Sequence, residues 1–170
     1  MASEEVVVSL PPDPKQVVEI WTDGGCKPNP GPGGWAAIMV YRGVEKELSG
    51  FERDTTNNRM ELTAAAAALE ALKRPCLVQL HTDSEYLKNG ITRWHEGWVR
   101  KNWRSSTGEP VKNMDLWKRV LEAAKTHTVE WRWVRSHIGI PLNERADKLA
   151  TAAREAGMRS GRAGGTPDRS

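Results

Sequence analysis

The chain has 170 residues and a formal net charge of +3, a size that predicts one domain with a sizeable hydrophobic core. No stretch approaches the roughly 20 consecutive apolar residues of a membrane span, and the first residues lack the basic and then apolar pattern of a signal peptide. Two cysteines in unlike contexts, Cys26 and Cys76, make a disulfide framework improbable. We therefore expect a cytoplasmic protein with no membrane partner.

The first half of the chain predicts a leader followed by an antiparallel meander. Residues 1–16 hold three prolines and no amphipathic pattern, so we expect them to be flexible. The elements expected after them are a strand at 17–23, a kinked Gly- and Pro-rich loop at 24–34, a hairpin of 35–42 and 44–51 around Gly43, and a helix from the capping residues 55–58 to about Lys73.

The second half predicts parallel strands, further helices and a protruding arm. The elements expected are a strand at 77–82, a short helix from Ser84 towards Gly90, a basic Trp-rich arm at about 93–113, a helix at 113–126, a strand at 128–134 and a helix from Pro141. The folded domain should span 17–156, and the Gly- and Arg-rich tail 157–170 should be disordered. This order predicts an α/β (mixed α+β) class, with three antiparallel strands, then two parallel ones, and helices on both faces of the sheet.

Charge is unevenly distributed along the chain. Residues 93–119 carry seven Lys or Arg against three acids, which gives +4, and residues 154–170 carry +2, so the remainder is −3. An acidic centre beside a basic arm suits a bound polyanion, although a charge run is more often a solvated face. Trp94 and Trp98 share one helix face within the arm. The alternative is that the arm's tryptophans are core residues of a small subdomain, and we expect at least one of them, with Trp94 as the first choice, to be mainly structural.

Four carboxylates stand at positions that predict a shared site. Asp23 and Asp83 each end an apolar run with the same Thr-Asp pair, and Glu61 and Asp147 lie near the starts of predicted helices. Each acid alone reads as an ordinary surface acid or helix cap, but two identical strand ends favour a joint role. Gathered carboxylates repel each other unless cations lie between them, and Mg²⁺ prefers such oxygen ligands.

Several motifs together resemble one family. Thr22-Asp23-Gly24-Gly25, the run from Asn29 to Gly34, Thr56 to Leu62, Thr82-Asp83-Ser84, Pro110 to Asn113, Trp131 to Val134 and Asn143 to Asp147 are similar to bacterial type 1 ribonuclease H. The resemblance runs from about Val17 to Ala153 in order and without a large gap. It implies a ribonuclease H-like fold, and an endoribonuclease that cleaves the RNA strand of RNA–DNA hybrids and leaves 5′-phosphate and 3′-hydroxyl ends.

The resemblance also implies a role for each acid. Asp23 resembles the residue that bridges two Mg²⁺ ions, for which Mn²⁺ is a possible substitute. Glu61 and Asp83 would complete the site nearer the leaving group, and Asp147 would hold the ion that activates the attacking water. Such a pair of cations neutralises charge on the entering and leaving oxygens. His137, in a Gly- and Pro-containing loop, would be a mobile base or proton carrier; its alternative is a loop histidine bonded to the backbone.

Candidate substrate contacts follow from chemistry and resemblance together. Short polar side chains suit recognition of RNA 2′-hydroxyls, whereas Thr56 and Asn113 resemble phosphate contacts to the DNA strand and Trp98 resembles its stacking residue. The residues that suit 2′-hydroxyls are Cys26, Asn29, Asn57 and Asn58. Each asparagine alone reads equally well as a cap or turn residue. We expect a monomer whose binding depends strongly on salt and little on base sequence.

Two positions depart from the family pattern, and two other functions stay open. Glu85 stands where glutamine is frequent, and Val99 where a basic residue is common. A non-catalytic module that binds nucleic acid would use the same arm and cleft but would tolerate loss of a carboxylate. A DNA strand-transfer or junction-cleaving enzyme would share the acids but should lack both the Asn-Pro-Gly-Pro-Gly-Gly loop and the Trp-rich arm.

Overall fold

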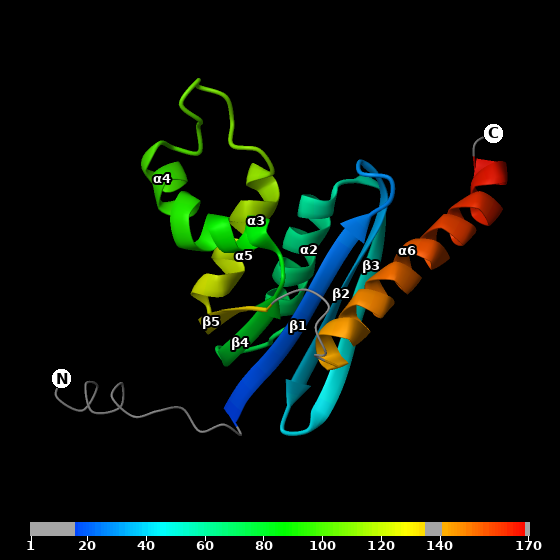
Figure 1. Ribbon diagram of the computed structural model, residues 1–170, viewed down its shortest axis with the longest axis horizontal. Coiled ribbons are helices and arrows are strands. Elements are labelled where there is room, and N and C mark those ends of the chain that lie inside the picture. The colour runs from blue at the N-terminus through cyan, green and yellow to red at the C-terminus, as the bar shows by residue number, and fades with distance from the viewer. Residues whose placement is uncertain (1–15, 135–140, 169–170) are drawn as a thin grey trace.

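The computed structural model describes residues 16–134 and 141–168 (Figure 1). Its elements in chain order are β1 (Val17–Cys26), β2 (Gly31–Tyr41), β3 (Val44–Thr55), α2 (Asn57–Glu70), β4 (Leu77–Thr82), α3 (Glu85–Asn89), η2 (Gly90–Trp94), α4 (His95–Arg100), α5 (Met114–Lys125), β5 (Thr128–Trp133) and α6 (Pro141–Asp168). Within these residues no helix is both long enough and apolar enough to cross a membrane.

The five strands form one mixed sheet in the order β3-β2-β1-β4-β5. β1, β2 and β3 pair antiparallel, whereas β4 and β5 continue the sheet in parallel with β1. This topology confirms the predicted arrangement. It places β1 and β4 side by side in the middle, so that their carboxyl ends open at the same edge.

The hairpin between β2 and β3 forms as predicted, but the Gly-rich segment before it differs. Arg42 and Gly43 have φ values of 52° and 80°, the left-handed pair that a tight hairpin turn requires. The segment 24–34 was expected to be a loop, yet Cys26 pairs with Gly33 and only residues 27–30 lie between the strands. Glycine and proline weaken a strand without forbidding one, and here flanking pairing on both sides extends the ladder.

One face of the sheet carries the main hydrophobic core. Even-numbered residues of β1, such as Ile20, point to this face and pack on α2, against which α5 lies. The alanines of α2 are almost all fully buried, because their small side chains let the helix lie close to the strands. Trp117 of α5 is fully buried on the same side. The core thus holds α2 rigidly against β1, and α2 carries Glu61.

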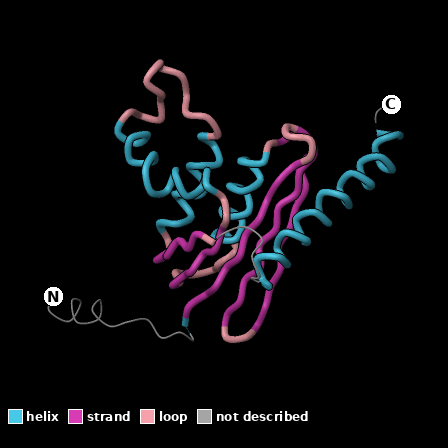
Figure 2. The backbone as a smooth tube through the Cα atoms, in the orientation of Figure 1, coloured by secondary structure: helices cyan, strands magenta, loops and turns pink. Residues whose placement is uncertain are grey.

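Helix α6 covers the opposite face of β1, β2 and β3, as Figures 1 and 2 show. A Cβ atom at Gly34 would overlap the carbonyl oxygen of Ala150, so glycine lets the helix pack directly on β2. α6 also continues past Gly157 to Asp168, where the sequence predicts a disordered tail. Gly157 lies against the ring of Phe51, so the helix still has a strand to pack on at that point.

Candidate active site

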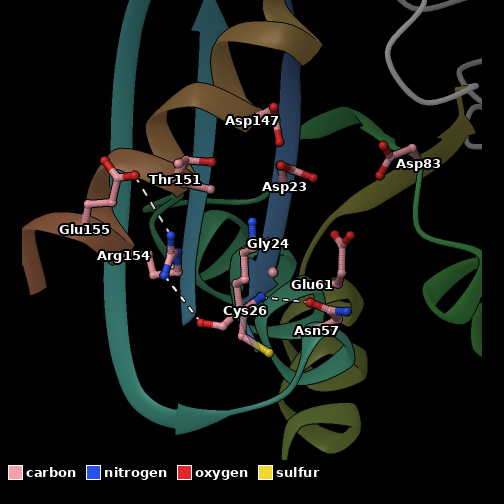
Figure 3. Close-up of a pocket in the computed structure, with 14 residues that line it drawn as sticks. Asp23, Gly24, Cys26, Asn57, Glu61, Asp83, Asp147, Thr151, Arg154 and Glu155 are labelled. Atoms are coloured by element: carbon pink, nitrogen blue, oxygen red, sulfur yellow. Dashed lines mark hydrogen bonds and ion pairs between the residues drawn. The ribbon is translucent and has the colours of Figure 1, made fainter. Parts of the chain in front are cut away.

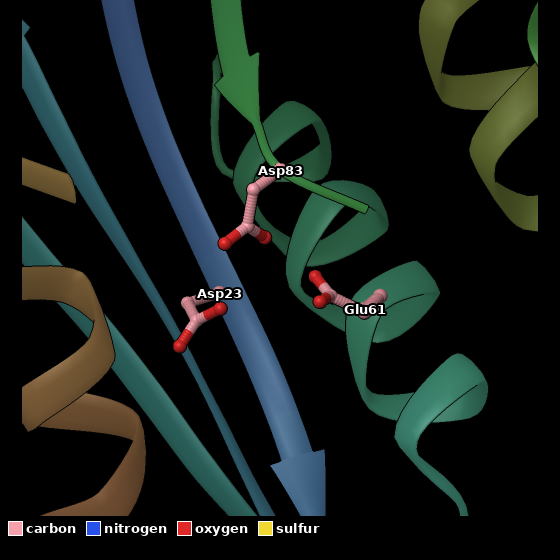
Figure 4. Close-up of side chains that lie close together, drawn as sticks. All are labelled: Asp23, Glu61 and Asp83. Atoms are coloured by element: carbon pink, nitrogen blue, oxygen red, sulfur yellow. The ribbon is translucent and has the colours of Figure 1, made fainter. Parts of the chain in front are cut away.

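Asp23 lies on β1 just beyond the point where its pairing with β4 ends. It pairs with Ala36 on β2, and the pairing of β1 with β4 ends two residues earlier, at Trp21 and His81. Asp83 follows directly after β4. Parallel neighbours in the sheet therefore bring the two Thr-Asp pairs together, as the sequence predicts (Figure 4).

Glu61 reaches the same place from α2 because β1 has no side chain at position 24. A Cβ atom on Gly24 would lie 2.5 Å from the carbonyl carbon of Met60 and 2.8 Å from the amide nitrogen of Glu61. Glycine at this position lets the first turns of α2 touch β1. The carboxylates of Asp23, Glu61 and Asp83 then offer oxygens that all lie within 4.8 Å of one another.

Asp147 completes the cluster from the other face of the sheet. It lies on α6 one helical turn before Ala150, where the helix packs on Gly34. Its carboxyl group lies within hydrogen-bonding reach of that of Asp23, and Figure 3 shows the two carboxyl groups facing each other.

The electrostatics of the cluster follow from burial and like charge. Burial, the hydrogen bond with Asp147 and the nearby charges of Asp83 and Asp147 together raise the pKa of Asp23 from 3.8 to about 8. Burial first, and then the neighbouring carboxylates, raise the pKa of Glu61 well above its ordinary value. Without a cation, ionisation of all these carboxylates therefore costs free energy.

The donor set fits a divalent cation. Oε1 of Glu61 is buried and has no hydrogen-bond partner among the described residues. An unpaired buried carboxylate oxygen is costly, and a hard cation would satisfy it with the oxygen ligands that Mg²⁺, Mn²⁺ and Ca²⁺ accept. The cluster can therefore hold a metal ion. It lies in a pocket of about 590 Å³ that also reaches Cys26, Asn57 and Arg154.

The loop between β1 and β2 is joined to the start of α2 by hydrogen bonds. The Cys26 amide donates to Oδ1 of Asn57 at 2.8 Å, and the Asn57 amide donates to Oδ1 of Asn29 at 3.1 Å. The Cys26 thiol also donates to Asn29 Oδ1 at 3.2 Å. Three predicted substrate contacts thus form one polar group beside the carboxylates. Asn58 is exposed on the same first turn of α2.

Comparison with known proteins gives a consistent result. The sequence profile of the RNase H family matches residues 15–155. The chain belongs to the RNase H family. It is 74% identical over 141 residues to Ribonuclease H of Granulibacter bethesdensis (strain ATCC BAA-1260 / CGDNIH1), an alignment that covers 83% of this chain and 94% of that protein. This confirms the resemblance to the bacterial enzymes and makes the chain a hydrolase of the nuclease class.

Two solved structures share the fold. LC9-RNase H1, described as a type 1 RNase H with the type 2 active-site motif, superposes with a TM-score of 0.75 at 32% identity, over 86% of this chain and 75% of that one. LC11-RNase H1 in complex with RNA/DNA hybrid gives a TM-score of 0.62 at 22% identity, over 83% of this chain and 99% of that one. The ribonuclease H-like fold is therefore confirmed.

Within this RNase H domain, Thr56 and Asn113 are fixed by a shared arginine. Thr56 caps α2 by accepting from the Arg59 amide at 3.1 Å. The Arg59 guanidinium donates to Oδ1 of Asn113 at 3.1 Å and forms a two-pronged pair with Asp115. Asn113 has a left-handed backbone, which asparagine tolerates, and its side chain does not cap α5. The side chain is instead held towards Arg59.

Tyr86 fixes the other side of Asn113. Its hydroxyl accepts hydrogen bonds from Nδ2 of Asn113 at 3.0 Å and from Nε1 of Trp117 at 2.9 Å. Sequence reasoning did not single out Tyr86, Arg59 or Arg154. The signal for Tyr86 was its place in the first turn after Asp83. The signal for Arg154 was its spacing of seven residues from Asp147, which puts both on one face of a helix.

The arm holds a structural tryptophan, as expected, and it is Trp98 more than Trp94. Trp94 is 38% exposed, and its ring packs on Tyr86. Trp98, the predicted stacking residue, packs against the core, with ring centroids 5.1 Å from Trp117 and 5.6 Å from Trp103. The i, i+4 spacing correctly placed Trp94 and Trp98 in contact, at 5.9 Å. Which of the two turns inward depends on Trp117, whose position the local pattern does not contain.

Three further positions complete the comparison with the sequence. Val99 is 58% exposed on α4, and Glu85 is exposed in the first turn of α3. Both therefore present their unusual side chains to solvent. His137 lies outside the described residues, so its role as a proton carrier stays a prediction.

Proposed function

We propose that the chain is an endoribonuclease that hydrolyses the RNA strand of RNA–DNA hybrids, as a monomer with two Mg²⁺ ions, and leaves 5′-phosphate and 3′-hydroxyl ends. The observation that carries the proposal is the group of three carboxylates within 4.8 Å, one with an unpaired buried oxygen, with Asp147 alongside. Relatives named Ribonuclease H support the activity, and the hybrid-bound LC11-RNase H1 shows that this fold accommodates such a duplex. The free thiols of Cys26 and Cys76 are compatible with a reducing cytoplasm, where we place the enzyme.

The four acids would divide the binding of the cations. Asp23 would bind both ions, Glu61 and Asp83 the one nearer the leaving oxygen, and Asp147 the one nearer the attacking water; Mn²⁺ would replace Mg²⁺. When bound, the ions would neutralise charge on the entering and leaving oxygens of the phosphodiester. His137 would carry a proton to or from the reacting groups.

The remaining contacts position the hybrid over these acids. The group of Cys26, Asn29 and Asn57, with Asn58 beside it, presents donors and acceptors suited to RNA 2′-hydroxyls. Thr56 and Asn113 would hold a phosphate of the DNA strand, and Trp98 would stack near it. Contacts to phosphates and sugars fix the register of the duplex and carry little sequence preference.

The proposal is tested with an end-labelled RNA–DNA hybrid and Mg²⁺, beside RNA duplex, DNA duplex and each single strand. We expect cleavage of the RNA in the hybrid alone, and its loss in EDTA. Asp23→Asn and Glu61→Gln should each lower kcat by about 10²-fold or more, since each removes several kcal/mol of charge stabilisation. The exposed carboxylate Glu122 provides the matched control, Glu122→Gln, which should leave kcat unchanged.

The other outcomes identify other functions. Tight binding of the hybrid without cleavage would indicate a binding module. Cleavage of DNA duplexes or junctions in place of the hybrid would mean that the fold serves a strand-transfer or junction-cleaving enzyme. A 5′-hydroxyl end on the product would contradict the proposed direction of attack.

A further inference from the structure

Arg154 lies on the face of α6 that lines the active-site pocket. Asp147, Thr151 and Arg154 follow one another at spacings of four and three residues, which stack on one side of a helix. The close contact of α6 with Gly34 fixes this face against β2, because a Cβ atom there would lie 2.8 Å from the Arg154 amide nitrogen. Figure 3 shows the guanidinium between α6 and the loop that follows β1.

The Arg154 guanidinium is mostly buried but weakly bonded. Its side chain is 18% exposed. Its contacts among the described residues are the Lys27 carbonyl at 3.5 Å, the Met158 sulfur at 3.2 Å and the Glu155 carboxylate at 3.9 Å. Glu155 is itself 54% exposed, so this pair is weak. A guanidinium has five N–H donors. Both hydrogen bonds use one terminal nitrogen, so the donors of Nε and of the other terminal nitrogen, which only the long contact with Glu155 approaches, can bind an anion.

The pocket around Arg154 is otherwise acidic. Its lining includes five carboxylates and two cationic side chains, Arg154 and Lys27. A phosphodiester that enters this pocket needs positive charge beyond that bound by the carboxylate cluster, and arginine matches two phosphate oxygens with a pair of parallel hydrogen bonds. Lys27 follows Cys26 in the loop proposed to contact 2′-hydroxyls, so Arg154 faces the side of the pocket assigned to RNA.

We infer that Arg154 is a substrate-binding residue that holds a phosphate of the RNA strand beside the scissile one, from the side of the loop between β1 and β2. This inference rests on the proposed function. The competing explanation is structural, since the contact with the Lys27 carbonyl would tie that loop to α6. The two differ in what removal of the guanidinium changes: a phosphate contact alters KM and its salt dependence, whereas a tie alters stability.

The first test compares Arg154→Ala and Arg154→Gln with Arg159→Ala, which removes the same charge from an exposed position on the same helix. We expect both Arg154 variants to raise KM for the hybrid about 10-fold, with kcat within about twofold, and to lower the slope of log KM against log salt by about 1. Arg159→Ala should match the wild type. Equal KM and slope in all proteins, or a fall in melting temperature without a KM change, would overturn the inference.

The second test identifies the strand, by means of hybrids in which one phosphate at a time is replaced by an uncharged methylphosphonate. Wild type and Arg159→Ala should lose affinity when one RNA phosphate next to the cleavage site is neutralised, and Arg154→Gln should be insensitive at that position alone. Insensitivity at a DNA phosphate, or at none, would overturn the inference while leaving the activity intact. A wild-type protein that does not cleave the hybrid would refute the proposed function, and the inference with it.

Discussion

Metal binding at the site depends on whether Asp23 is ionised. Without a cation the folded protein keeps a proton on Asp23 up to about pH 8, whereas the unfolded chain releases it near 3.8. The same cation that stabilises charge on a substrate would thus also stabilise charge within the protein. Metal binding must release this proton, so affinity for Mg²⁺ should rise with pH up to about 8.

This proton makes the stability of the metal-free protein depend on pH. Because the folded state binds a proton that the unfolded state has released, the contribution of Asp23 is fully present below about pH 4 and is lost as pH rises through about 8. Between these limits we expect the free energy of unfolding to fall by up to about 1.4 kcal/mol per pH unit. Glu61, whose pKa is also raised, acts in the same direction.

Urea unfolding in EDTA between pH 5 and pH 9 measures this slope. Asp23→Asn should flatten it and should make the metal-free protein more stable than the wild type at pH 8. Glu122→Gln, at an exposed site, should follow the wild-type curve. A slope that Asp23→Asn leaves unchanged would assign the pH dependence to other groups.

At the scale of elements, α2, α3 and α5 are joined through polar contacts around Asn113. The Tyr86 hydroxyl of α3 accepts from both Asn113 and Trp117, and Arg59 of α2 donates to Asn113 from the other side. The side chain proposed to bind a DNA phosphate is therefore fixed before the substrate arrives. Such preorganisation lowers the entropy lost on binding.

Tyr86→Phe tests this arrangement. It leaves the buried Trp117 N–H and the Asn113 amide without an acceptor, so we expect a loss of about 1–3 kcal/mol in the free energy of unfolding. Asn113 should lose its fixed orientation, and KM for the hybrid should rise about 5-fold with little change in kcat, the effect of about 1 kcal/mol in binding. Tyr41→Phe, at a tyrosine 39% exposed on the far end of β2, is the control. A changed kcat with constant KM would contradict a role in binding.

Elements with strong local patterns were predictable, and contacts between them were not. β4 occupies the predicted residues 77–82, and its residues alternate between more and less buried along the strand. The proximity of Asp23 and Asp83 was predictable because the same Thr-Asp pair follows an apolar run twice in the chain. The bond between Arg59 and Asn113 joins residues 54 positions apart, and no period contains it. The inward turn of Trp98 and the free donors of Arg154 likewise depend on how α5 and α6 pack.

At the scale of the molecule, the acids and the basic arm have opposite effects on the substrate. The carboxylate cluster repels a polyanion, whereas the arm, residues 93–113, carries a charge of +3. Figure 1 shows α4 and the loop after it standing away from the sheet, where they can contact a duplex lying across the site. In the proposed function the arm would therefore supply much of the attraction that brings the hybrid to the acids, and that attraction would weaken with salt.

Two double variants, each lacking two positive charges, distinguish attraction of the hybrid by the arm from attraction by the net charge of the protein. Arg100 and Lys101 are exposed at the end of α4, and Arg42 and Lys46 are exposed at the opposite end of the molecule, around the turn between β2 and β3. If each arm side chain neutralises one phosphate, Arg100→Ala with Lys101→Ala should lower the slope of log KM against log salt by about 2. Arg42→Ala with Lys46→Ala removes the same charge and should leave the slope unchanged. A side chain that contacts a phosphate releases counterions and so sets the salt slope, whereas a distant charge does not. Equal effects of the two pairs would therefore mean that net charge, and not the arm, attracts the hybrid.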